Sequence, residues 1–512
     1  MNNKSRTHNS ILNVTTGILS QALLMILNFV SRTLFIKILE VEYLGINSLF
    51  TNILTILSLA ELGVGSAITY SLYKPLAQKD EVLITSIVHF YKKIYTRIGI
   101  AILIFGVVLI PFLDYLIPIK PIQVKEDIRV IYLIFLINAS LSYFFSYKTS
   151  LLFADQKSAI NTKVGLFFNV FQTIVQIFIL FLFKDFILYL LVNVIFGFSL
   201  NFYLSNKVDK LYPFLKQNIA IEIADIKKTI IINAKASFLN KIAGAIMNGT
   251  DNIFINYFVG LALLGKFSNY VMLIALVNNF TAIIFSNINA SIANLVATEN
   301  KEKQRKTFLW INFINFWIFG ILSIILYFTI NLFITIWLGN TFLLPKSVSL
   351  ILVINFFMVG IQSSFWSFKS VYGLFKEGQY VVLITATLNL ILSYLLGEKF
   401  GIVGVLSATA LSRLITNFWY DPYIVIKKAL QIDFFKYFFK YLKYVFVVLL
   451  TGVCVNVISS YINSNIFFLF VINIILVLFL FNFFVYILFR NTDEYKESIQ
   501  KIIFIKSILF TK

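Results

Sequence analysis

The sequence is dominated by long apolar stretches, each bounded by charged or turn-forming residues. A helix needs about 20 mostly apolar residues to cross the roughly 30 Å hydrocarbon core of a bilayer, and about fourteen stretches reach that length. Hydrophobic residues make up 59% of the chain and charged residues 13%, compared with about 25% charged in typical soluble domains. A soluble fold could not bury this much apolar surface, so the sequence predicts an all-α membrane protein.

The expected spanning helices follow one another closely along the chain. Their approximate limits are residues 11–38, 43–73, 94–117, 128–154, 160–183, 186–206, 229–258, 261–297, 307–338, 347–373, 379–397, 401–426, 438–461 and 465–489.

Positive charge is distributed unevenly among the connections between these stretches. Loops after even-numbered spans are basic, as with Lys92, Lys93 and Arg97 after the second span, whereas the other loops are short and nearly balanced. Basic loops stay in the cytoplasm, so both termini are predicted to be cytoplasmic. This distribution explains the formal net charge of +20 as a membrane feature, and no nucleic-acid partner is expected.

The first six spans resemble the next six at an offset of about 220 residues. The pair Leu44-Gly45 aligns with Leu264-Gly265, and the segment containing Lys148 aligns with the segment containing Lys369. Six is an even number, so the two halves form a parallel repeat with a substrate path expected at their interface. The predicted parts are an N-terminal six-helix lobe (1–206), a cytoplasmic linker (207–228), a C-terminal six-helix lobe (229–430), two additional spans (431–489) and a cytoplasmic tail (490–512).

Polar side chains form narrow stripes on several of the predicted helices. At 100° per residue, Gly17, Gln21, Asn28 and Arg32 share one face of the first span. Span seven has a similar face, which includes Asn248. One interpretation is that such residues join helices by close packing and hydrogen bonds, and the other is that they line a polar passage.

Full charges within the spans favour the passage more strongly than the amides do. An Arg, Lys or Asp at mid-membrane costs about 2.5–3.5 kcal/mol on insertion scales, so such residues face water, a partner or a substrate. The candidates within spans are Arg32, Glu61, Lys241, Asp251 and Arg413. For Arg32 the alternative is an ion pair with Asp251 or Glu61, and Glu61 could instead be protonated or relay a cation.

Lys148 and Lys369 lie near the cytoplasmic ends of their spans. They either contribute to a binding site, as their duplication suggests, or snorkel to the lipid headgroups.

Enzymatic chemistry finds little support in the residues. The chain has one cysteine, Cys454, and two histidines, His8 and His89, so familiar catalytic and zinc constellations are absent from the sequence. There is also no nucleotide-binding loop, dinucleotide fingerprint or credible Ser-His-Asp arrangement. We therefore expect neither an enzyme nor a resident cofactor or metal.

Three motifs before residue 75 carry a resemblance to a known family. They are RTLFIKIL at 32–39, EYLGIN at 42–47 and LAELGVGSAI at 59–68. With these motifs the sequence resembles the polysaccharide-biosynthesis flippases, the oligosaccharidyl-lipid class of a superfamily that also contains multidrug and toxin extrusion exporters and the lipid II flippase. The general layout also resembles theirs, with two six-helix lobes and commonly two extra helices.

The resemblance implies a specific activity in the bacterial plasma membrane. It implies that an undecaprenyl-diphosphate-linked oligosaccharide moves to the outer leaflet by alternating access, for capsule, O-antigen or exopolysaccharide synthesis. Cationic cavity side chains bind the lipid diphosphate in related flippases, and this role transfers first to Arg32 and then to Lys241 and Arg413. The second half has Asn252 at the position matching Arg32, so a two-armed clamp would need another partner. Membrane lipids and polysaccharide polymerase machinery are the implied partners, and coupling to H⁺ or Na⁺ is open.

Two other functions compete with this one. A cation-coupled multidrug exporter of the same superfamily would use Glu61 or Asp251 to bind its cation. A membrane glycan polymerase would need a sizeable outer domain, whereas the predicted outer loops are short.

Overall fold

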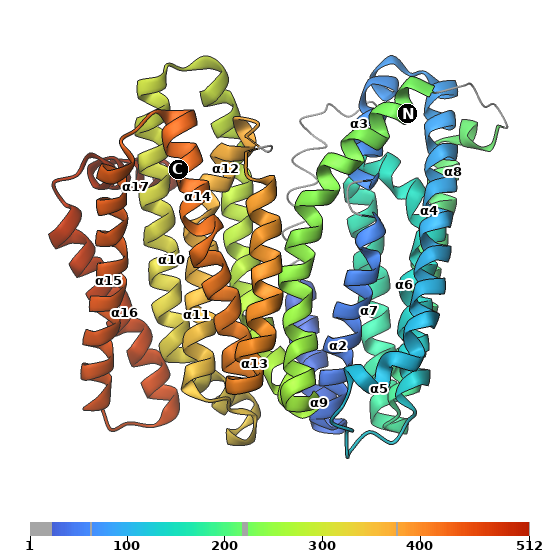
Figure 1. The fold of residues 1–512 in the computed structure, drawn as a ribbon, viewed down its shortest axis with the longest axis horizontal. Coiled ribbons are helices and arrows are strands. Elements are labelled where there is room, and N and C mark those ends of the chain that lie inside the picture. The colour runs from blue at the N-terminus through green and yellow to red at the C-terminus, as the bar shows by residue number, and fades with distance from the viewer. Residues whose placement is uncertain (1–22, 62–63, 218–223, 375–376, 511–512) are drawn as a thin grey trace. The chain divides into compact units, whose positions relative to one another are not determined.

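The computed structural model shows a helical protein, and the residues that it describes contain no strand (Figure 1). The chain divides into two compact units, Met1–Gly265 and Lys266–Lys512. The described residues are 23–61, 64–217, 224–374 and 377–510.

The first unit is built around α6, which packs against both α4 and α8. Asp80, Asp127 and Asp185 cap α4, α6 and α8, each carboxylate accepting a backbone N–H of the first turn. The helices of this unit are a helix over residues 23–38, α2 (Val41–Leu57), η1 (Ser58–Glu61), α3 (Val64–Gln78), α4 (Glu81–Leu109), η2 (Ile110–Phe112), α5 (Leu113–Leu116), α6 (Ile128–Ala154), α7 (Ser158–Phe183), α8 (Phe186–Leu211), η3 (Pro213–Lys216) and the first part of α9 (Ala224–Thr298).

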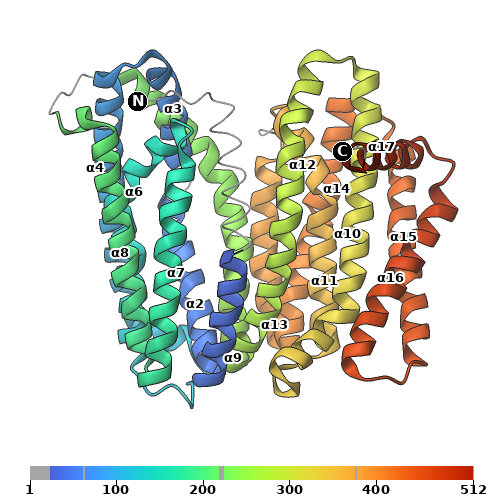
Figure 2. The same cartoon turned by 180° about the vertical axis from the view of Figure 1, so that it is seen from behind.

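The second unit is built around α10, which packs against α11, α15, α16 and α17. In Figure 2, α17 runs across the bundle, whereas α10, α15 and α16 run along it. The elements of this unit after α9 are α10 (Lys301–Leu338), η4 (Asn340–Phe342), α11 (Lys346–Ile361), α12 (Ser363–Val371), α13 (Gln379–Ile415), α14 (Asn417–Ile424), the π-helix η5 (Val425–Leu430), α15 (Phe434–Ser460), α16 (Ile466–Phe489) and α17 (Asp493–Phe510).

The predicted all-α membrane fold is confirmed. Among the described residues, 10 helices are long and apolar enough to cross a membrane. This number counts residues 380–430 as one span although Gly401, with φ +56°, separates two predicted spans there. It also omits the 17-residue α2 as too short. The prediction of about fourteen spans is consistent with this structure.

Several predicted boundaries agree closely with the structure, and others differ for identifiable reasons. The predicted break between spans seven and eight falls at Gly260, whose φ of +82° interrupts α9. The second predicted span comprises α2, the 3₁₀ turn η1 and α3 in the structure, so η1 interrupts its α-helical course. The third helix begins earlier than predicted, at Glu81, because Asp80 caps it well before its apolar part.

The duplicated Leu-Gly pairs pack against each other in the first unit. A Cβ added to Gly45 would lie 2.1 Å from the carbonyl oxygen of Leu261, and one added to Gly265 would lie 2.2 Å from the carbonyl oxygen of Val41. Each glycine therefore meets the backbone four residues before the other, as expected for two equivalent segments related by local symmetry. This contact joins α2 to α9 within the first unit, and the predicted domain boundaries, which follow the repeat, stay a prediction.

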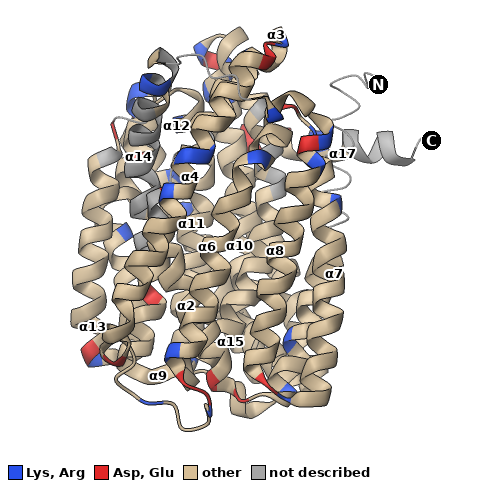
Figure 3. Cartoon of the chain, turned by 90° about the vertical axis from the view of Figure 1, so that its right-hand side faces the viewer, with Lys and Arg blue, Asp and Glu red and all other residues tan. Residues whose placement is uncertain are grey.

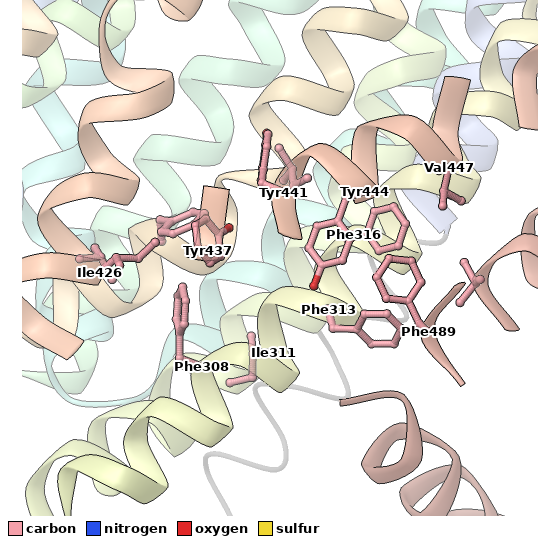
Figure 4. Packing of buried hydrophobic residues seen from close by; sticks show 14 of the residues in the cluster. Phe308, Ile311, Phe313, Phe316, Ile426, Tyr437, Tyr441, Tyr444, Val447 and Phe489 are labelled. Atoms are coloured by element: carbon pink, nitrogen blue, oxygen red, sulfur yellow. The ribbon is translucent and has the colours of Figure 1, made fainter. Parts of the chain in front are cut away.

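The two helices predicted to be appended pack onto the second unit through a buried aromatic cluster (Figure 4). Phe316 of α10 stacks on Tyr444 of α15, with ring centroids 4.2 Å apart and an 8° angle between the rings. Phe313 of α10 contacts Phe489 of α16 at 5.5 Å between centroids. Burial of several aromatic rings, each worth a few kcal/mol, fixes α15 and α16 to α10.

Charged residues gather at the helix ends within each unit (Figure 3). In the first unit Lys and Arg lie at the end where α3 is labelled, and in the second both charge types lie at the end where α17 is labelled. We call these the basic ends of the units.

Candidate functional site

Arg32 lies on the helix over residues 23–38, half-buried and beside Tyr189 of α8. One turn further on, Phe35 packs edge-on against Tyr189 and against Phe186, at 5.2 Å and 5.9 Å between ring centroids. These aromatic contacts hold the helix of Arg32 against α8. They place Arg32 next to Tyr189 within the first unit.

Glu61 lies at the end of η1, where the second predicted span is interrupted. Tyr95 of α4 donates a short hydrogen bond to Glu61 Oε1. Gly65 makes room for this contact, because a Cβ at that position would lie 2.9 Å from the Tyr95 hydroxyl oxygen. The sequence reasoning did not identify this tyrosine as a partner of Glu61.

Two further tyrosines surround the same carboxyl group. The ring of Tyr91 lies edge-on to that of Tyr95 at 4.2 Å between centroids, and Tyr143 of α6 is 5.7 Å from Tyr95. Tyr91 and Tyr143 both interact electrostatically with Glu61. A carboxyl group among phenol hydroxyls can accept hydrogen bonds when ionised or hold a proton when neutral. The spacing of Tyr91 and Tyr95 by four residues could have indicated this pocket, because such residues share one helix face.

Lys148 of α6 is paired with Asp209 of α8, at 2.7 Å between Nζ and Oδ2. Both side chains are largely buried, with 16% and 19% of their surfaces exposed. The structure therefore places this lysine in an ion pair inside the first unit, an arrangement that the sequence analysis did not consider.

Lys369 of α12 has the corresponding arrangement in the second unit. Its Nζ lies 2.6 Å from Oδ1 of Asp421 in α14, and Asp421 is only 4% exposed. Trp366 Nε1 donates a hydrogen bond to the other carboxylate oxygen at 3.2 Å. Asp421 could have been found by the rule that singled out Arg413, because it is an isolated acid within an apolar stretch.

A second cluster ties the basic end of the first unit together. The Tyr212 hydroxyl after α8 donates a hydrogen bond of 2.5 Å to Asp155 Oδ2, and Lys157 pairs with the same oxygen at 2.5 Å. Burial, and then the hydrogen bond to Asp155, raise the pKa of Tyr212 well above its ordinary value. The turn between α6 and α7 is thus fixed to the end of α8.

The remaining predicted positions are distributed over both units. Asp251 in α9 and Arg413 in α13 are half-buried, and Asn28 is exposed on the helix over residues 23–38. The side chains of Lys241 and Asn248 in α9, and residues Gly17 and Gln21 of the first predicted stripe, lie outside the described part.

Comparisons with known proteins identify the fold. No protein-family model matches the sequence, and no curated protein matches it in sequence. Solved structures do match: the lipid II flippase MurJ in an inward closed conformation has a TM-score of 0.65 at 15% identity and covers 94% of this chain and 99% of that one. The chain has the fold of the MurJ and MATE transporters.

Two MATE structures also have the fold of this chain. An inward-facing multidrug resistance MATE transporter of the MOP superfamily has a TM-score of 0.59 at 13% identity, covering 77% of this chain and 93% of that one. A point mutant of the Vibrio cholerae MATE transporter VcmN has a TM-score of 0.54 at 14% identity, covering 81% and 94%. These structural neighbours are membrane transporters, and their fold accounts for most of this chain.

Proposed function

We propose that this chain is a flippase that moves an undecaprenyl-diphosphate-linked oligosaccharide across the bacterial plasma membrane by alternating access. The observation that carries the proposal is the extent of the structural match: the lipid II flippase covers 94% of the chain, whereas the inward-facing MATE transporter covers 77%. The resemblance of the segments at 32–39, 42–47 and 59–68 to saccharide-lipid flippases supports the same choice.

The physical requirements of such a cargo agree with the residues present. A hydrated saccharide cannot cross hydrocarbon unaided, so the protein must provide polar and cationic groups along its path while the lipid tail stays in the bilayer. Arg32 is the first candidate for the diphosphate, because a guanidinium binds phosphate oxygens through two parallel hydrogen bonds. Lys241 and Arg413 are the next candidates. In this proposal Lys148 and Lys369 act indirectly, by holding helix ends through their aspartate partners.

A cation-coupled multidrug exporter is the second candidate, and the Glu61 pocket is the observation that supports it. A carboxyl group contacted by Tyr95 and near two further tyrosines could exchange a proton during transport. The same pocket is compatible with an ion-coupled flippase. Identifying the transported molecule therefore distinguishes the two functions better than identifying a coupling ion does.

Deletion of the gene in its source bacterium, followed by analysis of the lipid-linked saccharides, tests the proposed function. We expect an undecaprenyl-diphosphate-linked oligosaccharide to accumulate and surface polysaccharide to be lost, with restoration by the wild-type gene and not by Arg32→Ala. Unchanged saccharide lipids together with increased drug sensitivity would instead support the exporter. Membrane levels of each variant, measured by quantitative immunoblot, control for failed insertion.

A further inference from the structure

The C-terminal helix α17 starts at the edge of the membrane-spanning region. The spanning helix α16 ends at Phe489, and α17 begins at Asp493, so three residues connect the two helices. Three extended residues reach at most about 10 Å. Because α17 also runs across the bundle (Figure 2), it lies near the level at which α16 leaves the hydrocarbon.

Contacts with α10 and α15 fix the first half of α17 at that level. Trp310 Nε1 of α10 donates a hydrogen bond of 3.1 Å to the Ser498 hydroxyl. The Lys501 ammonium lies 3.3 Å from the centre of the Trp310 ring. Glu494 pairs with Lys440 of α15.

Aromatic side chains from α10 and α16 pack against α17 where it leaves the bundle. Tyr495 of α17 stacks on Trp317 at 5.8 Å between ring centroids and lies 6.3 Å from Tyr486. Trp310 contributes the contacts with Ser498 and Lys501 described above. Trp and Tyr are enriched at membrane–water interfaces, where their polar atoms reach the headgroups and their rings contact acyl chains.

Beyond Lys501 the helix changes from charged to apolar. Ile502 and Ile503 are 52% and 61% exposed, and the sequence continues as FIKSILFTK to Lys512. Exposed apolar side chains such as Ile502 and Ile503 gain free energy by entering the interface when they lie at the headgroup level.

The charges of the same segment favour a membrane surface that carries negative charge. After Glu497 the chain contains Lys501, Lys506 and Lys512 and no acidic residue. Lysines near an anionic bilayer surface are attracted to its headgroups. Lys501 pairs with Glu497 at 2.6 Å, whereas Lys506 and Lys512 follow with no acidic residue beyond them in the sequence. The combination of exposed isoleucines and this net positive charge therefore fits anionic lipid headgroups over their acyl chains.

We propose that the C-terminal part of α17, from Lys501 onward, is an interfacial membrane anchor that binds anionic phospholipids. The bound surface is the leaflet at the basic end of the second unit. The anchor would fix the end of α16 and the start of α10 relative to the lipid headgroups, independently of which cargo is transported.

The test uses the full-length protein with a single fluorescent label at a chosen position. In a Cys454→Ser background, Ile503→Cys and the matched control Gln500→Cys are labelled with an environment-sensitive dye. Gln500 is exposed one turn earlier and lies beside Asp493, Lys496 and Lys501. The proteins are reconstituted into phosphatidylcholine vesicles with or without phosphatidylglycerol, and quenching by brominated lipid is compared with quenching by aqueous iodide.

We expect the label at residue 503 to be quenched at least threefold more by brominated lipid than the label at 500, with the difference larger when phosphatidylglycerol is present. Replacing Lys506 and Lys512 with Gln should remove that dependence on phosphatidylglycerol. Equal iodide quenching at both positions would overturn the proposal. So would shielding of residue 503 that increases with the protein-to-lipid ratio, because a second copy of the chain would then cover the segment.

Discussion

At the scale of single residues, the charged side chains of this protein fall into two physical classes. Lys148 and Lys369 are each held by an aspartate within their own unit, at 2.7 Å and 2.6 Å. Arg32 lies among aromatic side chains beside Tyr189. A paired lysine stabilises helix contacts and has little capacity left for a ligand, whereas an arginine can present several donors at once. Because a guanidinium can present several donors to one ligand, the proposed function predicts that transport depends more on Arg32 than on either lysine.

Replacing Lys369 with Met should destabilise the protein by about 3–5 kcal/mol, because it leaves the Asp421 carboxylate buried without its counter-charge. Asp421→Asn should cost less, since the flexible four-carbon stem of Lys369 allows its ammonium to move toward water. The double variant should recover part of the loss. A double-mutant cycle on thermal unfolding in detergent measures this coupling.

The surface pair of Lys303 and Glu299 provides the matched control for that cycle. It has the same charge types at 2.6 Å but is 58% and 37% exposed, so Lys303→Met should change stability by less than about 1 kcal/mol. Equal losses for Lys303→Met and Lys369→Met would show that burial of the Lys369 pair carries no energetic weight.

The Glu61 pocket gives a second prediction at this scale. Tyr95→Phe removes the hydroxyl that donates to the carboxyl group and should destabilise the protein by about 1–3 kcal/mol. Glu61→Gln keeps an acceptor oxygen and should be milder. If Glu61 exchanges a proton during transport, Glu61→Gln should abolish the pH dependence of transport while the protein still folds. Proteoliposome assays of transport at several pH values measure this. A stable variant with an unchanged pH profile would remove Glu61 from coupling.

At the scale of helices, close backbone contacts depend on two glycines at equivalent positions of the repeat. The carbonyl oxygens of Val41 and Leu261 occupy the space where a side chain would begin at Gly265 and Gly45, respectively. Backbone cannot move aside as a flexible side chain can. The contact between α2 and α9 therefore requires the absence of a Cβ at both positions.

Gly45→Ala and Gly265→Ala should both strongly destabilise the protein, each lowering the unfolding temperature by several degrees because the helices must separate. Gly452→Ala is the control: Gly452 lies within α15 with no other atom within 4 Å of an added Cβ. Alanine there should be neutral or stabilising by up to about 1 kcal/mol. Thermal unfolding of the three purified variants checks this, and unaffected Gly45→Ala and Gly265→Ala proteins would contradict the close approach.

Much of the helical layout could be predicted from the sequence because length and hydropathy determine which segments can span a bilayer. The breaks near Gly260 and Gly401 were placed to within a few residues because glycine and charge interrupt the apolar pattern. Helix starts such as Glu81 were missed, since a capped helix can extend beyond its apolar part. The partners Asp209, Asp421 and Tyr95 were also missed, because contacts between distant helices leave no periodic pattern in one sequence.

At the scale of the whole molecule, the repeat connects fold and proposed function. The alignment of the two halves predicted that the Leu-Gly pairs and the two lysines occupy equivalent positions. The structure adds an aspartate to each lysine. Each Lys-Asp pair joins two helices within its own unit, and the proposed alternating access would require such internally fixed units.

The measurement that tests this account most directly is translocation in proteoliposomes. Vesicles carrying a defined undecaprenyl-diphosphate-linked oligosaccharide are prepared with wild-type protein, with Arg32→Ala or with no protein. A membrane-impermeant oxidant then reports how much saccharide reaches the outer leaflet. The account predicts that wild-type protein makes the oligosaccharide of the inner leaflet accessible to the oxidant. It also predicts that Arg32→Ala reduces the rate of translocation at least tenfold at equal protein incorporation. Wild-type vesicles indistinguishable from protein-free vesicles, or full transport by Arg32→Ala, would contradict it.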